Sequence, residues 1–236
     1  MIRWEHGEDG RYSLCTLVLG RPHFPNYTYI VSSPDGDAVV IDPGYSAELI
    51  RLEMACHRLH LRAILLTHGH SDHVAATSVL TGPDAVPVFL LEGEQLDAGC
   101  DIAPLTRCSH DHVLQAGSIE ITPIATPGHS SGSVCYLIGD FLFTGDTVFI
   151  EACGDCSGLS GSIDAMFDSI FMLKRRIAPH VRVFPGHRYR AEPGVCFRDV
   201  LNRNIYFRLE QRDAFAAWYR RAATGLDKEN ARHAAT

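Results

Sequence analysis

The sequence lacks any long run of apolar residues. Its longest apolar stretches, such as Ala63–Leu66, are far shorter than the roughly 18 residues that a membrane-spanning helix needs. The first ten residues also lack the apolar stretch of a signal peptide. No segment has the composition of a flexible linker. We therefore expect a cytoplasmic protein without a membrane partner, folded as one unit.

A second pair of closely spaced cysteines is also missing. The eight cysteines include one Cys-x-x-Cys motif, Cys153 to Cys156, whereas a zinc ribbon needs two such motifs at a matched distance. Several other cysteines lie in apolar segments, as buried reduced thiols do. In a chain without an export signal a disulfide framework is not expected. The pattern favours a structural or incidental role for Cys153 and Cys156.

The two signs of charge are unevenly distributed. The formal net charge is −7, yet residues 1–173 contain 7 basic and 22 acidic side chains, whereas residues 174–221 contain 12 basic and 4 acidic ones. No nucleic-acid-binding motif accompanies the basic segment, and acidic residues lie among its arginines. We interpret it as a solvent-exposed helix face and expect no nucleic-acid partner.

Short strands and helices alternate along the chain. Strands are predicted at residues 14–19, 27–32, 38–42, 63–67, 86–90, 112–114, 119–124, 134–138, 141–143 and 181–184, and helices at 47–59, from 73, at 163–177, 197–207 and 213–223. Two strand-rich halves that each carry helices predict an α/β sandwich of two sheets with helices outside. Residues 225–236 are expected to be frayed.

The strongest chemical signal is a loop in which four metal-binding side chains occupy six positions. His68, His70, Asp72 and His73 directly follow the predicted strand 63–67. Alternation along an extended backbone points His68 and His70 to the same side, and Asp72 and His73 begin the next helix. Three imidazoles and a carboxylate at this spacing are typical of a site for zinc, iron or manganese.

Three further metal-binding side chains follow strands at turns. His129 lies in Pro127-Gly128-His129, Asp146 in Thr144-Gly145-Asp146 and His187 in Pro185-Gly186-His187. A single histidine in a turn is usually structural. Three such residues at successive strand ends indicate an open site that collects them with the first four.

In order and local context these motifs resemble the metallo-β-lactamase superfamily, over about residues 14–190. The resemblance implies an αββα sandwich with the metal site at one edge of the two sheets. It implies a catalytic domain at residues 1–190 and a helical extension at residues 191–236 packed on the same domain. It also implies a first metal held by His68, His70 and His129, a second held by Asp72, His73 and His187, and a bridging Asp146. Asp42 is implied to orient a ligand histidine.

The carboxylate expected at the bridging position indicates which branch of the superfamily the sequence resembles. The commonest β-lactamases have a cysteine at the position of Asp146 and lack His73 as a ligand, so the pattern is more similar to glyoxalase II and its relatives, which hydrolyse thioesters. Tyr189 matches a family tyrosine near the thiol substrate. Glyoxalase II has a larger C-terminal domain that binds glutathione; here 49 residues follow His187, and the basic residues of that domain do not match one by one.

A further likeness covers residues 143–210. Through residues 149–156, 166–170, 192–194 and 204–207 the chain resembles the zinc-dependent hydrolases of bacterial polyketide biosynthesis clusters. This implies a dinuclear enzyme, with zinc as the expected metal and iron or manganese as alternatives. It would release acyl groups from carrier-protein thioesters, with Asp72 orienting the attacking hydroxide. The alternatives are a hydroxyacylglutathione hydrolase, a lactonase or persulfide dioxygenase, and a non-catalytic carrier-binding module.

The basic segment offers a way to attract an acidic carrier protein. The arginines that come soonest after His187 are Arg188, Arg190, Arg198 and Arg203. We expect them to surround the mouth of the site. In the alternative interpretation they neutralise the acidic remainder of the same chain.

Overall fold

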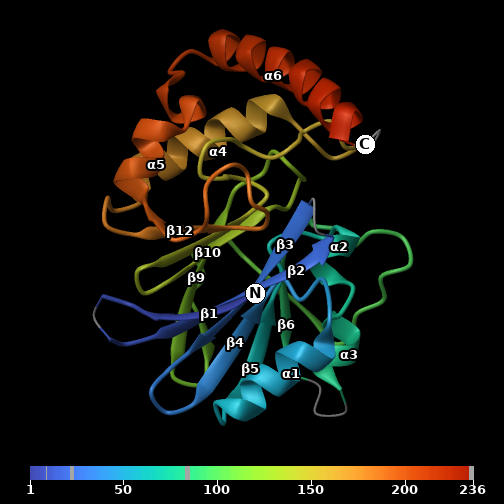
Figure 1. The fold of residues 1–236 in the computed structure, drawn as a ribbon, viewed down its shortest axis with the longest axis vertical. Coiled ribbons are helices and arrows are strands. Elements are labelled where there is room, and N and C mark those ends of the chain that lie inside the picture. The colour runs from blue at the N-terminus through green and yellow to red at the C-terminus, as the bar shows by residue number, and fades with distance from the viewer. Residues whose placement is uncertain (9, 22–23, 83–85, 234–236) are drawn as a thin grey trace.

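The computed structural model describes residues 1–8, 10–21, 24–82 and 86–233. Two sheets pack face to face between two layers of helices, so the predicted αββα sandwich is confirmed (Figure 1). The first sheet contains, in sequence order, β1 (Ile2–His6), β2 (Ser13–Arg21), β3 (Phe24–Ser32), β4 (Asp37–Ile41), β5 (His60–Leu65), β6 (Val88–Leu91) and β7 (Leu105–Cys108). The second contains β8 (Leu114–Ala116), β9 (Ile119–Ala125), β10 (Val134–Ile138), β11 (Phe141–Gly145), β12 (Arg182–Pro185) and β13 (Val195–Cys196).

Parallel strand pairs decide where the functional residues meet. β4 and β5 run parallel, so Asp42 and His68 leave the first sheet at the same edge. β11 and β12 also run parallel, so Asp146 and His187 leave the second sheet side by side. The turn that carries His129 joins β9 to β10 at this same end of the sheet. The carboxyl ends of such strands are where ligand sites gather in α/β proteins.

Three apolar clusters hold the layers together. Large side chains between the two sheets, among them Tyr136, Phe143 and Phe184, are completely buried. The outer face of the first sheet packs against α1 (Ala47–Cys56) and α3 (Thr77–Thr81). The outer face of the second sheet packs against α4 (Ile163–Arg176), α5 (Phe197–Arg203), the 3₁₀ helix η1 (Ile205–Arg208) and α6 (Arg212–His233). The chain after residue 190 therefore shares a core with the second sheet through residues such as Phe215.

Several predicted elements differ from the observed ones. β1, β7 and β13 were not predicted, and the strand expected at 112–114 is instead β8, at Leu114–Ala116. The helix expected from residue 73 is two short helices, α2 (Ser71–Val74) and α3. The helix expected at 197–207 is interrupted at Asn204, whose side chain accepts from the Tyr206 N–H and donates to backbone carbonyls of a neighbouring loop.

The C-terminal helix is longer than the sequence indicates. The prediction of fraying from residue 225 is wrong up to His233, because α6 continues to that residue; residues 234–236 lie outside the described part of the chain. Within the described ranges, no helix combines the length and the apolar composition needed to cross a bilayer.

Candidate metal centre

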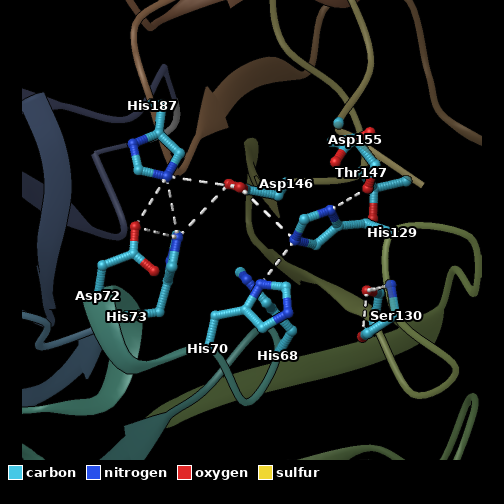
Figure 2. A network of polar contacts seen from close by, with 12 residues as sticks. His68, His70, Asp72, His73, His129, Ser130, Asp146, Thr147, Asp155 and His187 are labelled. Carbon is cyan, nitrogen blue, oxygen red and sulfur yellow. Dashed lines mark hydrogen bonds and ion pairs between the residues drawn. The ribbon is translucent and has the colours of Figure 1, made fainter. Parts of the chain in front are cut away.

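Seven side chains that were singled out in the sequence converge at one edge of the sandwich (Figure 2). Their potential ligand atoms form three overlapping groups, and within each group all atoms lie within 4.8 Å of one another. The groups are His68, His70 and His129; His68, His73 and Asp146; and Asp72, His73 and His187. The structure thus brings together every ligand residue that the motifs predicted.

The first group is built from two loops. His68 and His70 lie in the loop after β5, and His129 lies in the loop between β9 and β10. Nε2 of His129 lies 2.9 Å from Nδ1 of His70. Nε2 of His68 is buried and has no hydrogen-bond partner among the described residues. A buried nitrogen of this kind is costly unless something binds it.

The second group faces the first from the other side. His73 and His187 approach each other through their Nε2 atoms at 3.1 Å. Oδ2 of Asp72 lies 3.4 Å from Nε2 of His187. Asn26 holds this carboxylate by donating to Oδ2 over 3.1 Å and to the Asp72 carbonyl over 2.9 Å.

Asp146 lies between the two groups (Figure 2). Its Oδ2 is 3.4 Å from Nε2 of His187 and 3.7 Å from Nε2 of His129, and its Oδ1 is 3.6 Å from Nε2 of His73. Oδ1 is also buried without a hydrogen-bond partner in the described part of the chain. One carboxylate therefore faces both histidine groups at once.

In three of the histidines the hydrogen bond of Nδ1 fixes the tautomer, and with it the role of the Nε2 atom that faces the site. Nδ1 of His73 is bonded to the Asp42 carboxylate, Nδ1 of His129 to the Asp155 carbonyl and Nδ1 of His187 to the Pro25 carbonyl. A carbonyl or carboxylate oxygen can only accept, so each Nδ1 must donate. Each neutral ring then turns the lone pair of its Nε2 inward. When the rings are neutral, as metal binding requires, these inward lone pairs and the carboxylates of Asp72 and Asp146 form a donor set that fits two divalent metal ions.

The charges of the site point the same way. Burial lowers the pKa of His187, but Asp146 and Asp72 outweigh it and raise this pKa to about 10. Burial likewise lowers the pKa of His73, and Asp146 and Asp42 raise it on balance. Burial raises the pKa values of Asp72 and Asp146, and the neighbouring histidines lower both on balance. The carboxylates thus stay ionised and favour positive charge beside them, which a proton on His187 or bound metal ions would supply.

Backbone geometry keeps the space between the groups open. Gly186 precedes His187, and a Cβ atom at Gly186 would lie 2.5 Å from Oδ1 of Asp146 and 2.6 Å from Cε1 of His73. Any side chain at this position would therefore push into the ligand cluster. Asp42, whose φ is 48°, lies in the left-handed region that aspartate tolerates, and its carboxylate meets Thr67 and His73.

The Cys-x-x-Cys loop contacts the site through backbone atoms. Both cysteines are free, and burial raises their pKa values, that of Cys156 to about 11. A raised pKa makes a thiol unreactive. Between them, Gly154 packs on the backbone of Asp146, where an added Cβ atom would lie 1.8 Å from the carbonyl oxygen. Asp155 then offers its carbonyl to His129.

The residues expected to bind substrate have different surroundings in the structure. Tyr189 stacks on Phe149 with ring centroids 6.2 Å apart, and Phe149 lies 6.3 Å from the His187 ring. The Arg190 guanidinium lies over the Tyr189 ring at 5.7 Å, and Arg188 pairs with Glu192 at 2.9 Å.

The two remaining arginines lie on α5. Arg203 is exposed and directly precedes Asn204, which binds the carbonyls of Phe149 and Ala152. The backbone N–H of Arg198 donates to Pro179, near the start of β12, whereas His187 follows the end of that strand. This contact places the start of α5 at the opposite end of β12 from His187.

Comparison with known families gives this arrangement a context. The sequence matches the family model described as Metallo-beta-lactamase superfamily over residues 20–94 and 111–187. The chain belongs to the metallo-β-lactamase superfamily. The matched residues include all seven clustered side chains, so the family and the geometry converge on the same edge of the sandwich.

Within the metallo-β-lactamase superfamily the chain has curated relatives of two kinds. It is 36% identical over 208 residues to the probable polyketide biosynthesis zinc-dependent hydrolase BaeB of Bacillus velezensis, covering 88% of this chain and 92% of BaeB. It is 34% identical over 146 residues to a hydroxyacylglutathione hydrolase of Pectobacterium carotovorum, covering 61% of this chain and 55% of that enzyme.

Solved structures share the fold of this chain. TTHA1623 in a di-iron-bound form matches with a TM-score of 0.68 and 27% identity, covering 80% of this chain and 98% of that one. ETHE1 from Myxococcus xanthus matches with a TM-score of 0.68 and 22% identity, over 91% of this chain and 88% of that one.

Three residues that hydrogen-bond to the ligand loops or to their partners were not identified as site residues from the sequence. Thr67 binds Asp42 and His68, Asp155 binds His129, and Glu94 binds both loops of the first histidine group. Thr67 is next to a motif and Asp155 lies inside the Cys-x-x-Cys loop, so proximity to a motif was the one available signal for these two.

Proposed function

We propose that this chain is a dinuclear metal-dependent hydrolase of acyl thioesters. The observation that carries the proposal is the placement of Asp146 between two complete sets of ligand atoms. Zinc is the proposed metal, since BaeB is described as a zinc-dependent hydrolase; the di-iron form of TTHA1623 makes iron the first alternative, and manganese the next.

Two metal ions held by these ligands would lower the pKa of a bound water toward about 7 and would polarise the carbonyl oxygen of a substrate. The second site would be formed by Asp72, His73, His187 and the shared Asp146. The side chain of Asp72 is the most exposed of these, at 34%, whereas those of Asp146, His187 and His73 are 11%, 3% and 1% exposed. The exposed part of its carboxylate is therefore open to an incoming water, which it orients by accepting a hydrogen bond from the water O–H. Asn26 keeps that carboxylate in place.

A thioester suits a site of this composition. The departing thiol has a pKa of about 8.5, so it leaves as a thiolate and needs no dedicated general acid. Tyr189 is partly exposed and stacks on the buried Phe149 beside His187, so its ring offers an aromatic face against which the arm of a thiol substrate can lie. A phosphopantetheine arm on an acyl carrier protein has this elongated form, and we propose such a carrier as the natural thiol.

Two measurements test this proposal. Protein purified without chelator should contain about two metal equivalents per chain by elemental analysis. One acyl group should then be offered on a carrier protein, on coenzyme A and on glutathione, so that the thiol alone differs. We expect the largest kcat/KM with the carrier. Less than one equivalent of metal, or no turnover of any thioester, would contradict the proposal.

Hydroxyacylglutathione hydrolysis is the second candidate. It is favoured by the 34% identity to the Pectobacterium enzyme, although the aligned region covers 55% of that enzyme. Faster turnover of the glutathione thioester than of the carrier thioester would establish it.

Three further functions would each give a distinct result with the same metal-loaded protein. Ring opening of lactones indicates a lactonase, and oxygen consumption with persulfides indicates a dioxygenase. Carrier binding without any turnover indicates a non-catalytic module.

A further inference from the structure

Glu94 is a buried carboxylate that lies between the two loops of the first histidine group. It follows β6 and its residue is 3% exposed. It belongs to none of the clusters whose ligand atoms converge. A buried carboxylate is costly unless its oxygens are hydrogen-bonded, so the contacts of Glu94 indicate what it does.

The carboxylate binds one loop with each oxygen. Oε1 accepts from the backbone N–H of Gly69 over 2.9 Å. Oε2 accepts from Oγ of Ser130 over 2.9 Å and from the backbone N–H of Gly132 over 2.7 Å. Gly69 separates His68 from His70, and Ser130 directly follows His129.

Close packing leaves neither loop room to move independently. A Cβ atom at Gly132 would lie 2.5 Å from Cβ of Glu94, and one at Gly69 would lie 1.8 Å from the carbonyl oxygen of Gln95. Glu94 is itself anchored, because Arg107 donates to its carbonyl oxygen over 2.6 Å. The loops therefore pack directly against a fixed backbone segment.

We infer that Glu94 is the positioning residue of the first metal site, joining the loop of His68 and His70 to the loop of His129. One loop comes from the first sheet and the other from the second, so the carboxylate sets the separation of histidines that the two sheets supply. The second site is oriented by different residues: Asp42 binds His73 and Asn26 binds Asp72. Loss of the Glu94 carboxylate should consequently weaken one of the two sites selectively.

The test compares two buried acids by exchanging each for its amide. In Glu94→Gln the amide nitrogen must face at least one of the N–H groups, because both oxygens of Glu94 accept. Asp37→Asn is the matched control. Asp37 is also buried and accepts from Arg62 and from the Ser118 N–H, but it begins β4, whereas Asp42, which binds the ligand His73, follows the end of that strand. Ser130→Ala is the milder variant, since it removes one of the three hydrogen bonds.

Metal retention is the readout, and it does not depend on catalysis. Each full-length protein, loaded with metal, is equilibrated with increasing concentrations of a chelator, and the metal remaining per chain is counted. We expect Glu94→Gln to release one ion at about 10–100-fold lower chelator concentration and to keep the other, as loss of an orienting partner does. Ser130→Ala should release the same ion with a smaller shift. Asp37→Asn should hold both ions as the unaltered protein does, even if its Tm falls.

The identity of the weakened site follows from a second pair of variants. His187→Ala should hold one ion, in the first site, and adding Glu94→Gln should make that ion easy to remove. The cobalt-loaded proteins should show the matching change in visible absorption.

Wild-type retention of both ions in Glu94→Gln or Ser130→Ala, or parallel loss of both ions with Tm, would overturn the role of Glu94. The inference rests on the two-ion site of the proposed function and not on the thioester. Failure of the unaltered protein to hold two ions would refute that site itself.

Discussion

Asp42 accepts a hydrogen bond from Nδ1 of His73 over 3.0 Å, with both side chains almost completely buried. The same carboxylate accepts from the backbone N–H and the hydroxyl of Thr67. Asp42 thereby fixes the tautomer in which Nε2 of His73 turns its lone pair toward His187. The histidine that Asp42 orients is thus His73, on the second metal site.

Replacing Asp42 should weaken that site. In Asp42→Asn the amide nitrogen must face either His73 or the Thr67 donors, so one of these contacts becomes repulsive. We expect about a 10–100-fold lower affinity for one of two metal ions, measured by retention against a chelator. Thr67→Ser keeps the hydroxyl and should retain both ions. Equal affinity in Asp42→Asn and the unaltered protein would contradict the orienting role.

Metal uptake should release protons. The pKa of His187 is raised to about 10 by Asp146 and Asp72 against the opposing effect of burial, so the metal-free protein carries a proton there at pH 7. A histidine must be neutral to bind a metal, so affinity should rise with pH up to about 10. Calorimetry in two buffers of different ionisation enthalpy measures the released protons. His187→Ala, which keeps only the ion of the first site, should release fewer protons per chain, and an unchanged number would contradict the assignment.

Asp146→Ala distinguishes an enzyme from a binding module. The variant removes the carboxylate that faces both groups and leaves the apolar core untouched. We expect turnover to fall more than about 100-fold, beyond the cost of losing an outer partner. Carrier binding, measured by calorimetry with a non-hydrolysable acyl carrier, should persist. Unchanged turnover would exclude a bridging role for Asp146.

The C-terminal helix should influence the first metal site through Tyr219. Its hydroxyl accepts from the Cys156 N–H over 2.6 Å and donates to Oδ1 of Asp155 over 3.0 Å, and the Asp155 carbonyl binds His129. Tyr219→Phe leaves the buried Cys156 N–H without this partner, which costs about 1–3 kcal/mol of unfolding free energy.

The readouts for Tyr219→Phe are the Tm and the retention of metal. Both should fall relative to Trp218→Phe, a change at the exposed neighbouring position on the same helix. A lower Tm with unaltered metal retention would mean that α6 stabilises the fold without acting on His129.

The ligands could be found in the sequence because each belongs to a short motif at a strand end. Their spacing is local, and the parallel strands bring the motifs together at one edge. Glu94 and Tyr219 could not be found in this way. Their partners lie 25 to 65 residues away in the chain, and neither residue has a local pattern that points to the site.

The elements of the fold could likewise be predicted where a local apolar pattern marks them, and not where they depend on distant partners. The buried strands carry continuous apolar runs and were predicted, whereas β1 is half exposed and β7 has Thr106 and Arg107 exposed, so neither has a clear apolar pattern. The break in the helix at Asn204 depends on carbonyls of residues 149 and 152, more than 50 positions away. Periodicity alone cannot report such a partner.

The arrangement of the arginines sharpens the prediction of carrier docking. Arg188 directly follows His187, and its exposed pair with Glu192 is worth little in water. Arg203 lies beside the segment that Asn204 holds, near Phe149. Arg198 is also exposed, and its backbone binds the Pro179 carbonyl before the start of β12, whereas His187 follows the end of that strand, so Arg198 serves as the control.

If an acidic carrier is steered to this surface, Arg203→Glu and Arg188→Glu should lower kcat/KM for an acyl carrier about tenfold or more at low salt, whereas Arg198→Glu should change it little. The rate with the unaltered protein should fall as salt rises from about 0.05 to 0.5 M, because the Debye length shrinks below roughly 10 Å. A small neutral thioester should show neither effect, since it gains nothing from long-range attraction.

Equal effects of all three substitutions would mean that net charge, and not a defined docking surface, controls association. An absence of salt dependence with the carrier would mean that these arginines neutralise the acidic body of the same chain and do not attract a carrier.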